Sequence, residues 1–245
     1  MRKTAYLVFG LIVMAAVIGG AEDVASAPDK LWDSSAGLSF LSTSGNSETE
    51  TFGLDFKAIR KPTPWGLEFT GSFNRAESNS TLTAERYFGG LRGTRELSEK
   101  WTLFAGLSGE KDEFAGFDLR SIVEAGATYK AVDSAKYFLS FDGALSYTDE
   151  DRLEPVPDES FMSGLAAMHF IWKFSPTASL SQDLSYFPNF DTSSDWRAES
   201  VTALQAAMTD SLAVRLSYEM RYRNEPIGDA DDLDTTTKAS LVLNF

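Results

Sequence analysis

Apolar and polar residues alternate one by one through most of this chain, and this period restricts the fold more than any other property of the sequence. Residues 36–40 and 52–58 are short examples, with Leu54 and Phe56 on one face of the second. Side chains of a β-strand point to opposite sides in turn, so each segment is predicted to be a strand with one apolar and one polar face. Turn-forming residues at 44–47 predict a hairpin between them.

The same pattern recurs to the end of the chain. Further alternating segments lie at 65–74, 101–108, 119–129, 137–148, 179–186, 212–223 and 238–245, and less regular ones at 82–94, 162–174 and 196–208. About twelve antiparallel strands of this kind are typical of a transmembrane β-barrel. An even number of strands also places both termini on the periplasmic side of such a barrel.

The connections between these segments alternate in length. Short ones are predicted at 61–64, 96–100, 131–135, 175–177 and 209–211, and longer, more polar ones at 75–81, 111–118, 149–160, 187–195 and 224–235. Outer-membrane barrels have short periplasmic turns and longer external loops. The chain is therefore predicted to be all-β, a single antiparallel up-and-down transmembrane barrel with almost no helix after Ala27.

The N-terminus predicts export. Two basic residues precede an apolar stretch at 6–18, and small residues follow it. The stretch falls short of the roughly 20 residues of a membrane-spanning helix, and the arrangement is typical of a cleaved signal peptide. We expect removal of residues 1–21, with cleavage as late as residue 27 also open. Residues 22–245 then form a barrel in the cell outer membrane, in contact with its lipid and lipopolysaccharide.

Aromatic residues with the outward parity are predicted to form a girdle at the periplasmic membrane interface. Such girdles lie at strand ends, where amphipathic rings meet the lipid headgroups. The predicted members start or end their segments; they are Trp32, Trp65, Trp101, Tyr129, Tyr137, Trp172 and Phe245. A soluble β-sandwich gives no reason for this coincidence of position and parity.

Composition excludes several functions. The formal net charge is −14 and there is no cysteine. An acidic chain repels nucleic acid, whose binding needs Lys and Arg against phosphate. Without cysteine there is no disulfide framework and no thiolate metal site. We find no glycine-rich phosphate loop and no zinc-protease motif, so no cofactor and no metal are expected.

The polar faces carry charges of both signs, which are predicted to form a network in the lumen. The set is Asp55, Lys57, Glu68, Arg120, Glu124, Asp142, Asp183, Arg215, Glu219, Arg221, Arg223 and Lys238. Two interpretations remain open. The charges pair and fill a largely closed barrel, or they line a narrow pore whose arginines select anions. Pairing is favoured because an unpaired charge in a low dielectric is costly.

The arginines of segment 212–223 are the critical case. Arg215, Arg221 and Arg223 share one face of that strand, since alternate residues point the same way. We expect this row to pair with inward carboxylates such as those of Asp142 and Asp183, or of Glu68, and therefore expect small or absent conductance.

No catalytic group is apparent. The single histidine, His169, has inward parity, and no serine is placed beside it by the sequence, although nucleophilic catalysis needs a base within reach of a hydroxyl. We therefore do not expect an enzyme.

Segments 149–160 and 225–234 are rich in Asp and Glu and are predicted to be solvated external loops. A lipid hydrolase built on His169, and a cation-dependent binding or adhesion surface made by the acidic loops, are the alternatives.

Several motifs resemble a known family. They are Ser44-Gly45-Asn46-Ser47-Glu48-Thr49, Leu216-Ser217-Tyr218-Glu219, Asn224-Glu225-Pro226 and the terminal Leu241-Val242-Leu243-Asn244-Phe245. In this order they are similar to the YdiY-type salt-induced outer-membrane proteins, a family of unknown function. The resemblance implies the fold and location, and brings no catalytic residues. The C-terminal Phe245 also resembles the signal through which the barrel-assembly machinery recognises the last strand of a barrel.

Overall fold

A computed structural model describes residues 31–43, 49–62 and 64–245 of the chain. The predicted signal peptide at 1–21 and most of the first hairpin loop lie outside these residues. The strands are β1 (Trp32–Thr43), β2 (Thr49–Arg60), β3 (Trp65–Ser78), β4 (Thr81–Glu96), β5 (Trp101–Asp112), β6 (Phe117–Asp133), β7 (Tyr137–Arg152), β8 (Glu159–Lys173), β9 (Ala178–Pro188), β10 (Trp196–Ala207), β11 (Leu212–Arg223) and β12 (Leu233–Asn244).

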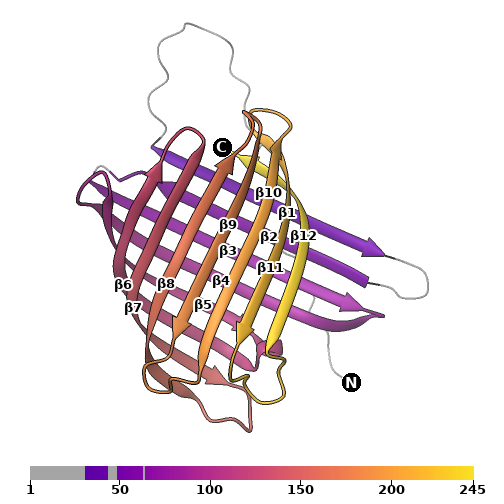
Figure 1. Ribbon diagram of the computed structural model, residues 1–245. Helices are drawn as coiled ribbons and strands as arrows, with labels where there is room; N and C mark the ends of the chain where they lie inside the picture. The colour runs from indigo at the N-terminus through magenta and orange to yellow at the C-terminus, as the bar shows by residue number, and fades with distance from the viewer. Residues whose placement is uncertain (1–30, 44–48, 63) are drawn as a thin grey trace, which may run out of the picture. The chain divides into compact units, whose positions relative to one another are not determined.

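The twelve strands form one closed antiparallel barrel in which each strand pairs with its neighbours in sequence (Figure 1). β1 and β12 close the ring through a short seam that joins residues 35–39 to 240–244. Backbone hydrogen bonds between Ser34 and Phe245 place the start of β1 and the end of the chain at the same end of the barrel. The predicted strand count and closed up-and-down topology are confirmed.

Helix is almost absent from the described residues. Its one element is a 3-10 turn, η1 (Glu113–Ala115), between β5 and β6. No helix in the described part of the chain is long and apolar enough to cross a membrane.

The outer wall is apolar because the alternation turns one side of every strand outward. Leu107, Val123 and Leu145 are each more than half exposed on this wall, where lipid rather than protein would cover them. A soluble protein rarely leaves so many large apolar side chains uncovered. The inward positions are polar, so the lumen is where function has to be sought.

Strands reach further towards the long-loop end than the sequence predicted. The expected loop at 75–81 is instead a two-residue turn. Asn79 and Ser80 adopt positive φ, and this tight turn lets β3 extend to Ser78 and β4 begin at Thr81. Beyond the apolar band the outward face of these strands becomes polar. Arg75, for example, pairs with Glu85 across the hairpin. The alternation ends there although the strands do not, and this is why the prediction was wrong.

Candidate functional site

Register brings opposite charges side by side on the inner wall. Glu110 of β5 lies opposite Arg120 of β6, and Arg120 lies opposite Glu150 of β7. Cross-strand neighbours on one face are close enough to interact directly. The three residues therefore form a ladder of alternating charge across three strands.

Glu150 is the centre of this arrangement. Its carboxylate is completely buried, with 0% of the side chain exposed. Arg120 Nε donates to its Oε1 at 2.8 Å, Arg223 Nη1 donates to the same oxygen at 3.0 Å, and Arg152 Nη2 donates to Oε2 at 2.8 Å. Arg223 comes from β11, so one carboxylate links β6, β7 and β11 through the interior.

Glu110 forms a second connection across the lumen. Arg86 Nε of β4 donates to Glu110 Oε1 at 2.6 Å, and Arg221 Nη2 of β11 donates to the same oxygen at 3.0 Å. Arg221 also donates to Asp112 Oδ2 at 3.0 Å. With Asp195, which accepts from Arg223 at 2.9 Å, these residues form what we call the luminal ion network: Arg86, Glu110, Asp112, Arg120, Glu150, Arg152, Asp195, Arg221 and Arg223.

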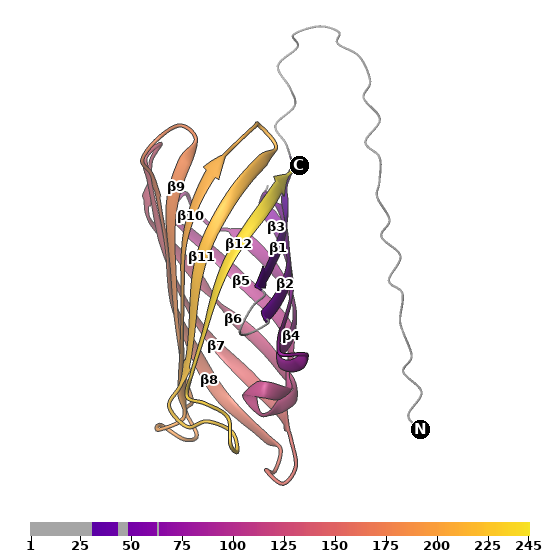
Figure 2. The same ribbon diagram turned by 90° about the vertical axis from the view of Figure 1, so that its right-hand side faces the viewer.

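The long connections lie together at one end of the barrel, at the bottom of Figure 2. Ile227, in the connection between β11 and β12, is buried, and it lies against Gly116. Gly116 has φ +89°, and a Cβ there would come within 2.7 Å of Ile227 Cβ, so only glycine fits. Phe117 is fully buried beneath the guanidinium of Arg120, 3.9 Å from its ring centre. Apolar packing and ion pairs together occupy this mouth.

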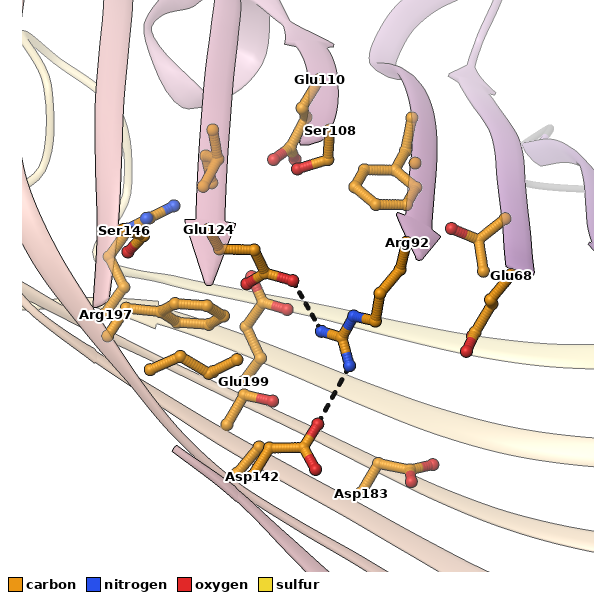
Figure 3. Close-up of a pocket in the computed structure, with 18 of the residues that line it drawn as sticks. Glu68, Arg92, Ser108, Glu110, Glu124, Asp142, Ser146, Asp183, Arg197 and Glu199 are labelled. Carbon is orange, nitrogen blue, oxygen red and sulfur yellow. Dashed lines mark hydrogen bonds and ion pairs between the residues drawn. The ribbon is translucent and has the colours of Figure 1, made fainter. Parts of the chain in front are cut away.

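Next to the network the lumen widens into a cavity of about 470 Å³, here called the chamber. Arg92 Nη2 donates to Glu124 at 2.7 Å and its Nη1 to Asp142 at 3.0 Å (Figure 3). His169 Nδ1 lies 2.9 Å from Asp183 Oδ1, and its Nε2 lies 3.6 Å from Asp142. A smaller cavity of about 290 Å³ lies near the β1–β12 seam.

The residues of the predicted lumen set all occupy inward-facing positions of their strands, in three places. The network holds Arg120, Arg221 and Arg223. The chamber is lined by Glu68, Glu124, Asp142, Asp183 and Glu219. The smaller cavity is lined by Asp55, Lys57, Arg215, Lys238 and again Glu219. Lys57 pairs with Glu68 at 2.8 Å, and Lys238 lies 3.8 Å from Asp55.

The expected partners of the β11 arginines were wrong. Arg221 pairs with Glu110 and Asp112, and Arg223 pairs with Glu150 and Asp195. Arg215 makes no ion pair with a described residue. Sequence parity gives the face of a residue but not its height in the lumen, and these arginines lie at the height of carboxylates that the prediction had assigned to strand ends and loops.

The most important residue that the sequence analysis missed is Glu150. It was assigned to a solvated external loop at 149–160, but β7 continues to Arg152 and β8 begins at Glu159. Arg86 and Arg92 were missed because the glycine-rich segment 82–94 hides its parity. The usable signal was the alternation Thr148, Glu150, Arg152 in phase with Ser146, which continues the polar face of β7.

The seven predicted girdle aromatics lie at the short-turn end of the barrel. Trp32, Trp65, Trp101, Tyr137, Trp172 and Phe245 are exposed on the outer wall. Tyr129 is partly covered by Trp101, with ring centres 4.9 Å apart. Tyr137 and Trp172 are directly paired in register across β7 and β8. The rings therefore gather in one belt around one rim.

Comparisons with known proteins agree with this architecture. A family described as "Protein of unknown function, DUF481" matches residues 36–245. The uncharacterized protein YdiY of Escherichia coli (strain K12) is 24% identical over 228 residues, covering 91% of this chain and 86% of YdiY. Two solved structures share the fold. The COG4313 outer membrane channel from Pseudomonas putida F1 has a TM-score of 0.52 at 14% identity, covering 87% of this chain and 94% of that one. The NanC porin has a TM-score of 0.51 at 11% identity, covering 86% and 98%.

Proposed function

We propose a role for this chain from its own geometry, because the family to which it belongs, DUF481, is one of unknown function. Membership of this family is what the resemblance of its motifs indicated. In this proposal it is an outer-membrane barrel of the bacterial envelope whose lumen is blocked at the long-loop mouth, so that it is a restricted pore rather than an open porin. The observation that carries the proposal is the luminal ion network, which ties β4, β5, β6 and β7 to β11 through the interior.

The network supports a restricted pore because its members are already neutralised by one another. An open charged ring attracts ions of one sign and leaves its side chains solvated. Here Glu150 is fully buried, and Arg120 is 3% exposed. Moving an ion through this layer would require breaking hydrogen bonds between charged groups, which are among the strongest in proteins.

Conductance in planar bilayers tests this proposal. We expect the wild-type barrel to carry little or no current. Replacing both Arg221 and Arg223 by alanine removes the two side chains that cross from β11, so the current should rise and favour cations, because the four carboxylates of the network would then face only three arginines. The matched control is Arg215→Ala, on the same face of β11 but outside the network, which should leave the low current unchanged. A large, anion-selective current in the wild-type protein would refute the proposal.

Location and orientation are part of the same proposal. The apolar outer wall and the aromatic rim suit a lipid bilayer. We propose that residues 1–21 direct export, that the terminal strand with Phe245 is recognised by the barrel-assembly machinery, and that both termini are periplasmic. The long-loop end then faces outward, next to lipopolysaccharide.

Single cysteines test the orientation cleanly because the chain has none of its own. Asp229→Cys, in the exposed connection before β12, should react with a membrane-impermeant maleimide on intact cells. Asp210→Cys, in the exposed turn between β10 and β11, should react only after the outer membrane is permeabilised. The reverse pattern would place the termini outside, and labelling of neither residue in permeabilised cells would argue against a surface barrel.

A hydrolase is not favoured by the geometry. Both ring nitrogens of His169 face carboxylates rather than a hydroxyl. A serine nucleophile needs a base within hydrogen-bond reach. We therefore propose that His169 is a structural member of the chamber wall, and that phospholipid is not hydrolysed by this protein.

A further inference from the structure

Arg197 of β10 is the unusual charge in the lumen. It is 8% exposed and lines the chamber, but it makes no ion pair or hydrogen bond with any described residue. No dashed line ends on it in Figure 3. Its guanidinium lies over the ring of Phe187, 5.0 Å from the ring centre. The other chamber arginines, Arg86 and Arg92, are each held by carboxylates.

Leaving a largely buried guanidinium without an ion pair is costly because an arginine stays charged. The neighbouring carboxylate of Glu150 is taken by three other arginines. Glu199, two residues along the same inward face, also lines the chamber but does not pair with Arg197. No carboxylate of the described residues therefore lies within ion-pair distance of Arg197, and the space beside it is a cavity.

We propose that the chamber binds a small organic monocarboxylate that carries several hydroxyl groups, with its carboxylate held by Arg197. The planar fork of a guanidinium matches a carboxylate with two parallel hydrogen bonds. A cavity of about 470 Å³ lies within the usual range for small-molecule sites.

The rest of the wall determines the class of ligand. Glu199 lines the chamber without an ion pair to a described residue, and it would repel a second negative charge on the ligand. A phosphate dianion is therefore disfavoured relative to a monocarboxylate. Carboxylates, together with the hydroxyls of Ser108 and Ser185, can accept hydrogen bonds from hydroxyl groups of the ligand. The inference needs only the chamber, and it holds whether or not the barrel conducts.

Calorimetric titration of the refolded full-length barrel in detergent tests this inference, with gluconate as the probe. We expect saturable binding of gluconate, no saturable binding of its uncharged counterpart sorbitol, and weaker binding of inorganic phosphate. Arg197→Gln should weaken gluconate binding about 10- to 100-fold, the effect of losing a charged hydrogen-bonded contact. The matched control is Arg215→Gln, which removes another inward arginine without an ion pair, but one that lines the smaller cavity. Its affinity for gluconate should stay at the wild-type value.

Each other result contradicts the inference. Absence of saturable gluconate binding to the wild-type barrel would overturn it, as would equal binding of sorbitol. Equal losses in both variants would show a general effect of positive charge rather than a site. Folding is checked by circular dichroism, and Arg197→Gln should fold, because the arginine has no ion pair or hydrogen bond with the described protein to lose. A barrel that cannot fold without Arg197 would show that the residue is structural. Conductance measurements are separate, so failure of this inference would leave the proposed restricted pore standing.

Discussion

Glu150→Gln is expected to lower the free energy of unfolding by about 3–5 kcal/mol, the usual loss when one member of a buried ion pair is removed. The amide keeps the size of the side chain, so the effect isolates the charge. Arg120, Arg152 and Arg223 would lose their shared carboxylate at once. Arg120 is nearly as buried as Glu150, so water cannot replace the hydrogen bond that its guanidinium would lose.

Urea unfolding of the barrel in lipid vesicles, followed by tryptophan fluorescence, measures this loss. The matched control is Asp151→Asn, the next residue along β7, which is exposed on the opposite face. It should change the free energy of unfolding by about 0.5 kcal/mol or less, as is usual for surface substitutions. The effect of Glu150→Gln should also persist at high salt, because buried pairs are screened little. Equal effects of the two substitutions would mean that the network does not support the barrel.

The fold was predictable because a single physical rule acts on every strand. A strand with lipid on one side and a polar lumen on the other requires apolar and polar residues to alternate with a period of two. The pattern is as clear at Leu103, Ala105 and Leu107 as it is at Leu212, Val214 and Leu216. Strand number and neighbour order follow once the alternating segments and short connections are counted. The same rule failed at 75–81 and 149–160, where strands rise beyond the apolar band and the outward face becomes polar.

The site was only half predictable, and the reason is geometric. Period two assigns Arg221 to the lumen, but its partner Glu110 is 111 positions away in sequence. Which inward residues meet depends on the tilt and stagger of the strands around the barrel, which are not visible in any one strand. The prediction therefore found that charges pair in the lumen but named the wrong partners. An unpaired residue such as Arg197 can be recognised only after all the pairs are known.

Leu107→Arg should cost about 2–4 kcal/mol of folding free energy, because it places a charge in the apolar band near its middle. Leu107 is 58% exposed on the outer wall. It is flanked in register by Leu91 of β4 and Val123 of β6, which leave the new guanidinium no polar partner. The long side chain could escape only by reaching along the wall to an interface, which is why the expected cost falls short of that for a fully trapped charge.

Ser108→Arg, one residue further along β5, is the matched comparison. Ser108 points into the chamber, where Glu110 and Glu124 also line the wall, so a guanidinium there finds water and carboxylates. Its cost should be about 1 kcal/mol or less. Both variants are compared by urea unfolding in the same vesicles, so that lipid composition cancels. A larger loss for Ser108→Arg than for Leu107→Arg would show that the wall assigned to lipid faces water, and the membrane location would have to be abandoned with it.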